Sequence, residues 1–210
     1  MKVQYSKAVL IILACSLSAV YTGCKKDDDP APIPTPTPAP VINAMSDLQI
    51  NWTMDGASHS WVENNQTPYF LLSTVNITGT TTSTAGYTMD FKDMTSTSAW
   101  IFRMLNHVYT PPCDSAKFLA FVPKDTIPFS AFGTNGISMQ FNDANNDVWR
   151  PVLTDSTNVF RIEDTYYYQS GGDQFVRFYA TFSCKVSPPA MSTPVKTVTG
   201  SAVLELKNDQ

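Results

Sequence analysis

The chain has few charged residues and only two histidines, and both scarcities exclude kinds of chemistry. Asp, Glu, Lys and Arg make up 15% of the 210 residues, and no basic run occurs after residue 26, which argues against a nucleic-acid partner. His59 and His107 lie outside any H-E-x-x-H motif, and the sequence contains no C-x-x-C and no G-x-S-x-G. The chain therefore lacks the residues that define zinc proteases, thiol oxidoreductases and α/β-hydrolases. We expect no catalytic residue, no metal ligand and no cofactor.

No apolar run in the sequence is long enough to cross a membrane. The longest covers residues 8–20 and follows Lys2 and Lys7, whereas a spanning helix needs about 20 apolar residues. A basic start, a short apolar run and a small-residue end are typical of a signal peptide. The run has no polar face, which disfavours the alternative of an N-terminal core helix. We therefore expect residues 1–23 to be a signal peptide.

The residues that follow this run resemble a lipoprotein processing site. Tyr21-Thr22-Gly23-Cys24 is similar to a bacterial lipobox, although Tyr21 stands where Leu, Val or Ile is usual. The resemblance implies that Cys24 carries a lipid that contains palmitate. It also implies that Cys24 is the first residue of the mature protein. Each buried CH₂ contributes about 0.8 kcal/mol, so several acyl chains would hold the protein on the membrane.

Residues 25–29 read Lys-Lys-Asp-Asp-Asp and resemble the signal that sends lipoproteins of the Bacteroidota to the outer face of the outer membrane. The alternative is a solvated charge cluster that keeps the chain extended. The resemblance implies an outer-membrane location at the cell surface.

Proline occupies every second position from Pro30 to Pro40. Each residue of this segment is a proline or precedes one, so none sustains a helix. Polyproline II, at about 3.1 Å per residue, would give a semi-rigid spacer of roughly 34 Å. We assign residues 24–43 to a lipidated N-terminus and tether, and residues 44–210 to one domain.

Apolar and polar residues alternate with period two through this domain, and no segment holds a helical period for three turns. Ile50, Trp52 and Met54 share one face of a first strand, and Asp55-Gly56 predicts a tight hairpin turn. The pattern predicts an all-β fold, an antiparallel β-sandwich of eight to ten short strands, rather than a closed lipocalin-type fold. Further candidate strands are residues 69–77, 87–92, 100–105, 118–122, 137–142, 148–150, 178–186 and 197–206.

Three motifs occur in the C-terminal stretch of the domain. Asp143–Trp149 forms a D-x-x-G-like turn before an aromatic residue, with Asn146 where glycine is more usual. Gly172–Phe182 resembles a G-x-F-x-A-x-F strand, and Thr197–Gly200 resembles a closing T-x-G-x strand. Together they resemble a group of uncharacterised outer-membrane lipoproteins of the Bacteroidota. The resemblance implies a β-rich C-terminal domain and a location, but no activity.

Two cysteines, Cys113 and Cys184, lie in the predicted domain. An oxidising compartment would favour a disulfide between them, which by loop entropy would stabilise the domain by roughly 4 kcal/mol. Cys184 also occupies an apolar position of an alternating segment, which favours a buried thiol instead. Both alternatives stay open, because the sequence does not give the distance between the two Cα atoms.

Acidic residues suggest two further kinds of site. Asp143, Asn145 and Asp147 alternate as in a calcium loop, but the loop's glycine and glutamate positions hold Val148 and Thr154. Hairpin turn chemistry explains the three residues without a metal.

A glycoside hydrolase would need two carboxylates about 5–9 Å apart. The candidates come from distant segments, and the pair Glu163-Asp164 is typical of a solvated strand end. They are Glu63, Glu163, Asp164 and Asp173.

Aromatic residues are the strongest candidates for binding. Trp61, Trp149, Tyr166, Tyr167 and Tyr168 offer flat rings that could stack on sugars, and tyrosine suits a wet surface. Because successive strand residues point to opposite faces, at least one of the three tyrosines should face away from the core. The alternative is that the tryptophans fill the core and the tyrosines coat one sheet.

These observations favour a non-catalytic, lipid-anchored module that binds an extracellular ligand such as a glycan. The alternative is a structural or protein-interaction component of an outer-membrane envelope complex.

Overall fold

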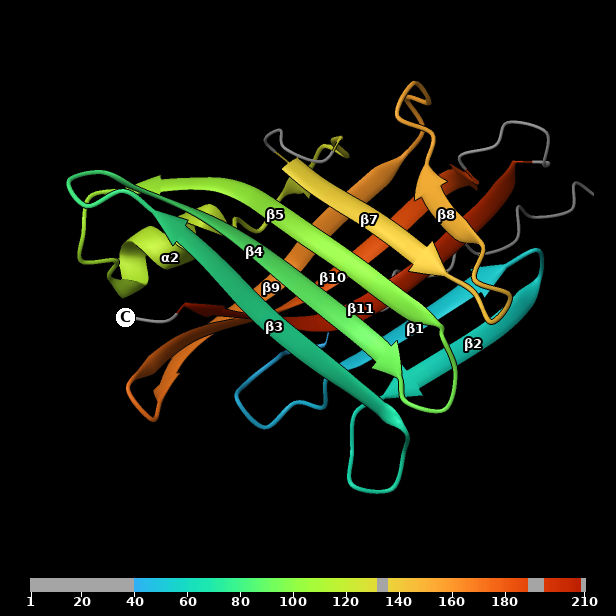
Figure 1. Cartoon of the computed structure of the whole chain (residues 1–210), viewed down its shortest axis with the longest axis horizontal. Helices are drawn as coiled ribbons and strands as arrows, with labels where there is room; N and C mark the ends of the chain where they lie inside the picture. Colours follow the sequence, from blue (N-terminus) through green and yellow to red (C-terminus); the bar gives the residue numbers. More distant parts are fainter. Residues whose placement is uncertain (1–39, 132–135, 189–194, 209–210) are drawn as a thin grey trace, which may run out of the picture. The chain divides into compact units, whose positions relative to one another are not determined.

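The computed structural model describes residues 40–131, 136–188 and 195–208 (Figure 1). The predicted signal peptide, the lipidation of Cys24 and most of the proline-rich tether lie outside these residues. The described elements are β1 (Gln49–Met54), β2 (Ala57–Val62), β3 (Tyr69–Thr78), β4 (Ser83–Asp93), β5 (Ala99–Tyr109), α2 (Ser115–Phe121), β6 (Thr126–Ile127), β7 (Gly136–Asn142), β8 (Val148–Pro151), β9 (Val159–Ser170), β10 (Asp173–Ser187) and β11 (Lys196–Asn208).

The strands form an antiparallel, sandwich-like arrangement of two layers, which confirms the predicted all-β class. Hydrogen-bonded neighbours follow the order β2-β1-β11-β10-β8-β7-β5-β4-β3, while β9 pairs with β10 and β6 with β9. We call β2, β1, β11, β10, β9 and β6 layer A, and β8, β7, β5, β4 and β3 layer B. Strand β8 joins the layers, because it pairs with both β10 and β7. The strands of the two layers cross in Figure 1.

The β1–β2 hairpin forms as the sequence predicts. Ile50, Trp52 and Met54 are buried on one face of β1. Asp55 and Gly56 connect the strands with φ values of 52° and 79°, the left-handed conformation that a two-residue hairpin turn of this type needs at both positions. The turn chemistry and the alternation therefore specify the same register.

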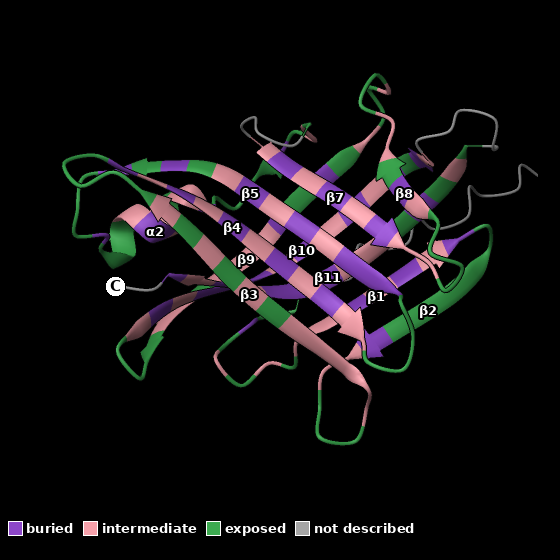
Figure 2. Ribbon diagram, in the orientation of Figure 1, coloured by how far each residue is buried: buried purple, intermediate pink, exposed green. Residues whose placement is uncertain are grey.

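The core lies between the two layers and is rich in aromatic rings. Buried and more exposed residues alternate along most of the strands (Figure 2). Trp100 is fully buried and stacks on Phe141 at 4.7 Å between ring centroids, while Trp52 meets it edge-on at 5.5 Å. Such ring pairs contribute about 0.5–1.5 kcal/mol each beyond the area they bury.

The predicted strand over residues 118–122 is wrong, because most of this segment belongs to the helix α2. Asp114 caps the helix, and its side chain accepts a hydrogen bond from the Lys117 amide at 2.9 Å. Phe118 is the helix residue buried in the core. A helix of seven residues is shorter than the three turns that a periodicity test requires.

Eleven strands occur among the described residues, and several are longer than predicted. Strands β9, β10 and β11 have 12, 15 and 13 residues. Strand β9 is obscured in the sequence because Asp164 directly follows Glu163, and two consecutive polar residues break the apolar alternation. Glu163-Asp164 is therefore not a strand end. Glu163 lies inside β9 and accepts a hydrogen bond from Thr181 on β10 at 3.2 Å.

Packing of the domain extends into the segment that the sequence assigned to the tether. We call residues 40–46 the N-terminal arm. Ile42 in the arm is 4% exposed and belongs to the hydrophobic core. Its amide donates to Asp164 on β9 at 3.2 Å. Among the residues described, no helix is long and apolar enough to cross a membrane.

Candidate functional site

The two tryptophans predicted to stack on a ligand lie in the interior. Trp61 is 8% exposed and stacks on Tyr69 at 5.1 Å. Trp149 is 4% exposed, and its Nε1 donates to Asp143 while the ammonium of Lys196 lies 4.5 Å from its ring centre. Neither indole offers an open face, so the alternative of core tryptophans holds for both.

The three tyrosines of β9 point to two faces, as strand geometry requires. Tyr167 packs against the core, whereas Tyr166 is 38% exposed. The ring of Tyr168 stacks on Phe175 at 5.0 Å, and its hydroxyl donates to Glu205 at 2.6 Å. The tyrosines therefore do not form one platform, and Tyr166 alone is open to solvent.

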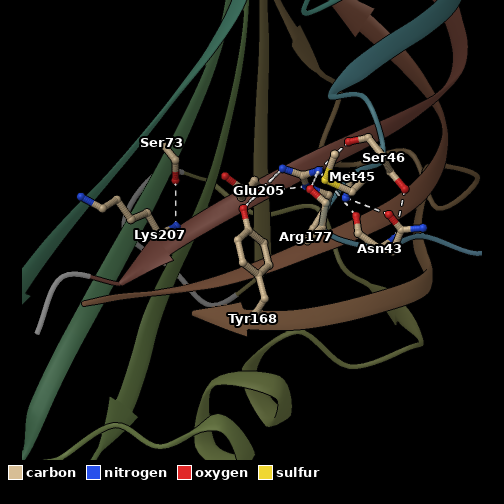
Figure 3. Close-up of polar contacts among 9 residues, drawn as sticks. Asn43, Met45, Ser46, Ser73, Tyr168, Arg177, Glu205 and Lys207 are labelled. Carbon is tan, nitrogen blue, oxygen red and sulfur yellow. Dashed lines mark hydrogen bonds and ion pairs between the residues drawn. The ribbon is translucent and has the colours of Figure 1, made fainter. Parts of the chain in front are cut away.

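Tyr168 belongs to a buried ion-pair network, the Arg177 cluster (Figure 3). It consists of Arg177, Glu205 and Tyr168, together with the backbone carbonyls of the N-terminal arm. Arg177 donates to Glu205 through Nε at 2.9 Å and Nη2 at 2.6 Å. Nη1 donates to the carbonyls of Ala44, at 2.8 Å, and Ser46. Every nitrogen of the guanidinium has a partner, so the cluster fixes the arm to layer A.

Burial and the bond to the Glu205 carboxylate raise the pKa of Tyr168 to about 12. Its hydroxyl therefore stays protonated and remains a donor. Burial, and then the negative charge of Glu205, raise the pKa of Glu63 above the ordinary value, although the Leu71 amide opposes this shift.

The four carboxylates that a glycoside hydrolase could have used have different partners in the structure. Glu163 contacts Thr181 and Arg161, Asp164 pairs with Lys124, and Asp173 pairs with Lys207 at 2.9 Å. Glu63 interacts instead with Glu205 and Arg177. The like charge of Glu205 acts on Glu63, and Glu205 itself is paired with Arg177 at 2.6 Å.

The disulfide considered for Cys113 and Cys184 is absent, and both thiols are buried. The carbonyl of Cys113 accepts a hydrogen bond from Gln174, near the start of β10. Cys184 lies near the end of that strand, roughly 30 Å further at about 3.3 Å per residue. A disulfide requires Cα atoms within about 7 Å. The alternative of a buried thiol at Cys184 is therefore confirmed.

Burial raises the pKa of both thiols, that of Cys184 to about 12, and at Cys113 the charge of Asp114 adds to the effect. Thiols with raised pKa values are poor nucleophiles and poor metal ligands.

The turn considered for calcium is held by its own hydrogen bonds. Asp143 Oδ1 accepts from the amides of Asn145, at 2.9 Å, and Asp147, at 3.0 Å, while Oδ2 accepts from Trp149. Asn146 adopts φ 67°, which asparagine tolerates. Within the described part of the chain, no three His, Cys, Asp or Glu side chains are grouped so that they could hold a metal ion.

His107 is the more buried of the two histidines, at 5% exposure. Its Nδ1 lies 2.9 Å from the hydroxyl of Tyr87, and its ring stacks on Phe121 at 4.5 Å. Burial lowers the pKa of His107, outweighing its hydrogen bond with the Lys117 backbone. The neutral ring is a component of the core.

An open pocket with both polar and apolar lining residues lies on the outer face of layer B, and the sequence analysis did not predict it. We call it the Arg150 pocket. Its volume is about 580 Å³, within the range of small-molecule sites. Among the residues that the structure describes, no carboxylate lines it. Its lining includes Arg103 on β5, Ser138 and Gln140 on β7, Arg150 on β8, and Ser130 and Leu153 from the adjoining loops.

Backbone register brings these side chains together. Arg103 on β5 pairs with Ser138 on β7, and Arg150 Nε donates to the Gln140 side chain at 3.1 Å. The side-chain amide of Gln140 in turn donates to Asn142 at 2.8 Å. The two terminal amino groups of Arg150 have no partner among the described residues. They remain available for a ligand.

A second pocket of about 440 Å³ adjoins the first and shares Arg103 with it. We call it the Thr88 pocket. It lies over β3, β4 and β5, and its lining is mostly threonine and asparagine, with Asn76, Thr78, Thr84, Thr88 and Asn106 beside Arg103.

The outer face of layer B is more positive than the chain as a whole. Outward positions on β4, β5 and β8 carry Lys92, Arg103 and Arg150 against the carboxylate of Asp90, which pairs with Lys92 at 3.3 Å. The whole chain has a net charge of −4. Alternation in the sequence indicates that these side chains face outward, but it does not show that they converge. Convergence depends on the order and register of β5, β7 and β8.

The fold and these pockets define a sandwich-like all-β domain with a cationic, pocketed outer face. No protein-family model matches the chain, and no similar protein was found among curated proteins or solved structures. Function is therefore inferred from the residues themselves.

Proposed function

We propose that this protein is an exported lipoprotein of the outer membrane, anchored through lipid on Cys24, whose domain binds an extracellular glycan in the Arg150 pocket without catalysing a reaction. The anchor and the surface location rest on the resemblance of residues 21–29 to lipoprotein signals. The glycan rests on the chemistry of the pocket.

One observation carries the binding role. Arg150, Gln140 and Ser138 converge in a pocket in which the terminal nitrogens of Arg150 have no partner among the described residues. Serine and glutamine side chains donate and accept hydrogen bonds, and the guanidinium donates from a planar fork. A sugar hydroxyl group both donates and accepts hydrogen bonds, so it needs acceptors as well as donors in the pocket. A pocket of this volume with a few converging polar groups is typical of a binding site for a small molecule.

The aromatic residues predicted to stack on a ligand do not line this pocket. Both tryptophans are buried, and Tyr166 is the exposed tyrosine. The glycan site is therefore on the outer face of layer B and not on the aromatic residues.

The location is tested with the full-length protein in a Bacteroidota host. Cells are labelled with a clickable palmitate, with Cys24→Ala as control, and intact cells are treated with protease. We expect label in the wild type, no label in Cys24→Ala, and loss of the domain from intact cells. Label without loss of the domain would place the protein in the periplasm and favour the envelope-complex alternative.

The binding role is tested by applying the full-length protein, in detergent micelles, to a glycan array. Arg150→Ala should abolish the signals that the wild type gives, while Arg161→Ala on β9 should leave them unchanged. Absence of wild-type signals, or signals that Arg150→Ala retains, would overturn the proposal.

A further inference from the structure

We infer that the ligand of this face is an acidic oligosaccharide that spans two subsites, the Arg150 pocket and the Thr88 pocket, joined at Arg103. The inference rests on the proposed function and specifies the class of glycan.

Continuity of the two pockets is the first support. Both are lined by Arg103, which lies on β5 between Thr88 on β4 and Ser138 on β7. The combined surface crosses β3, β4, β5, β7 and β8, which are neighbours in the sheet. With strands about 4.8 Å apart, this surface extends over roughly 19 Å. That length suits several linked sugar units rather than one ring.

Charge is the second support. The acidic chain presents Lys92, Arg103 and Arg150 against Asp90 on this face, and none of the described residues that line the two pockets is a carboxylate. A guanidinium matches a carboxylate or sulfate group with two parallel hydrogen bonds. Both terminal nitrogens of Arg150 have no partner in the described part of the chain and could form such a pair. An acidic group of the ligand would therefore bind in the Arg150 pocket.

The character of the Thr88 pocket distinguishes a glycan from a nucleic acid. Its lining provides hydroxyl and amide groups from Asn76, Thr78, Thr84 and Thr88, with Arg103 as its cation. A nucleic acid carries a charge on every nucleotide and needs a denser row of cations. Widely spaced cations with hydroxyl and amide groups between them fit a chain of sugars better.

The test is calorimetric titration of the full-length protein in detergent micelles with galacturonate and its oligomers, beside neutral malto-oligosaccharides of equal length. We expect the hexamer of galacturonate to bind at least about tenfold more tightly than the monomer, and neutral oligomers to bind at least about tenfold more weakly. Added salt should weaken hexamer binding, because it screens the arginines.

Two variants separate the subsites. Arg150→Lys keeps the charge but loses the planar fork, and should weaken both monomer and hexamer. Thr88→Val removes one hydroxyl from the second pocket, and should weaken the hexamer several-fold while leaving the monomer unchanged. Unchanged unfolding midpoints in urea establish that both variants fold.

The outcomes separate this inference from the proposed function. Equal affinity for neutral and acidic oligomers, or affinity that does not increase with length, overturns the two-subsite acidic ligand and leaves a glycan-binding module. Tighter binding of a single-stranded oligonucleotide than of the galacturonate hexamer overturns the inference in favour of another polyanion. Absence of binding to every saccharide overturns both.

Discussion

Arg177 on β10 and Arg150 on β8 both occupy outward positions of their layers, yet their surroundings differ. Arg177 is 8% exposed because the N-terminal arm covers it, and its nitrogens bind Glu205 and carbonyls of the arm. Arg150 is exposed, and within the described ranges its hydrogen bond is the one from Nε to Gln140. The comparison shows that a segment packed over a sheet, rather than the strand pattern, decides whether an outward arginine stabilises the fold or is available for a ligand.

Removing the covered arginine should have the largest effect. Arg177→Ala leaves Glu205 buried without a counter-charge and leaves the arm carbonyls without their donor. We expect a loss of about 3–5 kcal/mol in the free energy of unfolding, measured by urea denaturation. The matched control is Arg161→Ala, whose exposed pair with Glu163 should contribute less than about 1 kcal/mol. Equal losses in the two variants would contradict a structural role specific to Arg177.

The hydroxyl of Tyr168 should have the next largest effect. Tyr168→Phe removes its bond to the Glu205 carboxylate, and hydrogen bonds to charged groups contribute about 1.5–3 kcal/mol. Tyr166→Phe, on the same strand but exposed, should change the free energy of unfolding by less than about 0.5 kcal/mol. If Tyr168→Phe lowered the free energy of unfolding no more than Tyr166→Phe does, the result would contradict a stabilising role for the Tyr168 hydroxyl in the Arg177 cluster.

Burial also affects the titration of His107, which lies in the core at 5% exposure. Because burial lowers the pKa of His107, the unfolded chain binds a proton there at higher pH than the folded chain does. The stability that this ring contributes is therefore present above its unfolded pKa of about 6.5, and is lost as pH falls below that value.

We expect the urea midpoint of the wild type to fall between pH 7 and pH 5, and to fall less in His107→Gln. Thr88→Val, which changes no titratable group, is the control and should keep the wild-type slope. An unchanged slope in His107→Gln would assign the acid sensitivity to other groups.

Arg150 should have the smallest effect on stability. Arg150→Ala removes one hydrogen bond at an exposed position, so its free energy of unfolding should lie within about 0.5 kcal/mol of the wild type. A loss above about 1 kcal/mol would show that Arg150, like Arg177, stabilises the fold, and the difference between the two regions would disappear.

Strands with uninterrupted alternation could be predicted from the sequence, and those with paired polar residues could not. Ile50, Trp52 and Met54 identify β1, and the Asp55-Gly56 turn sets its hairpin. Strand β9 could not be predicted, because its consecutive charged residues break the alternation. In the structure these residues have partners on β10, in the arm and in the loop before β6. Helix α2 was missed because it has too few residues to show a period.

The candidate site was harder to predict than the fold. Tryptophan has both a large apolar surface and a flat face, so the sequence alone does not decide between core and ligand for Trp61 or Trp149. The register of β5, β7 and β8 brings Arg103, Ser138 and Arg150 into one pocket, and single-sequence alternation carries no information on which strands are neighbours. Both the burial of the tryptophans and the position of the pocket depend on which strands are neighbours in the folded domain.

The attachment of the N-terminal arm has a mechanical consequence. A pull on the chain from before residue 40 reaches the domain first at the arm, where one guanidinium holds the carbonyls of Ala44 and Ser46 and one carboxylate holds the amide of Ile42. Because a single side chain binds two carbonyls, these hydrogen bonds share the applied force and break in one step. Under load the arm would therefore detach as one unit before the hydrogen bonds between the strands of the two layers break.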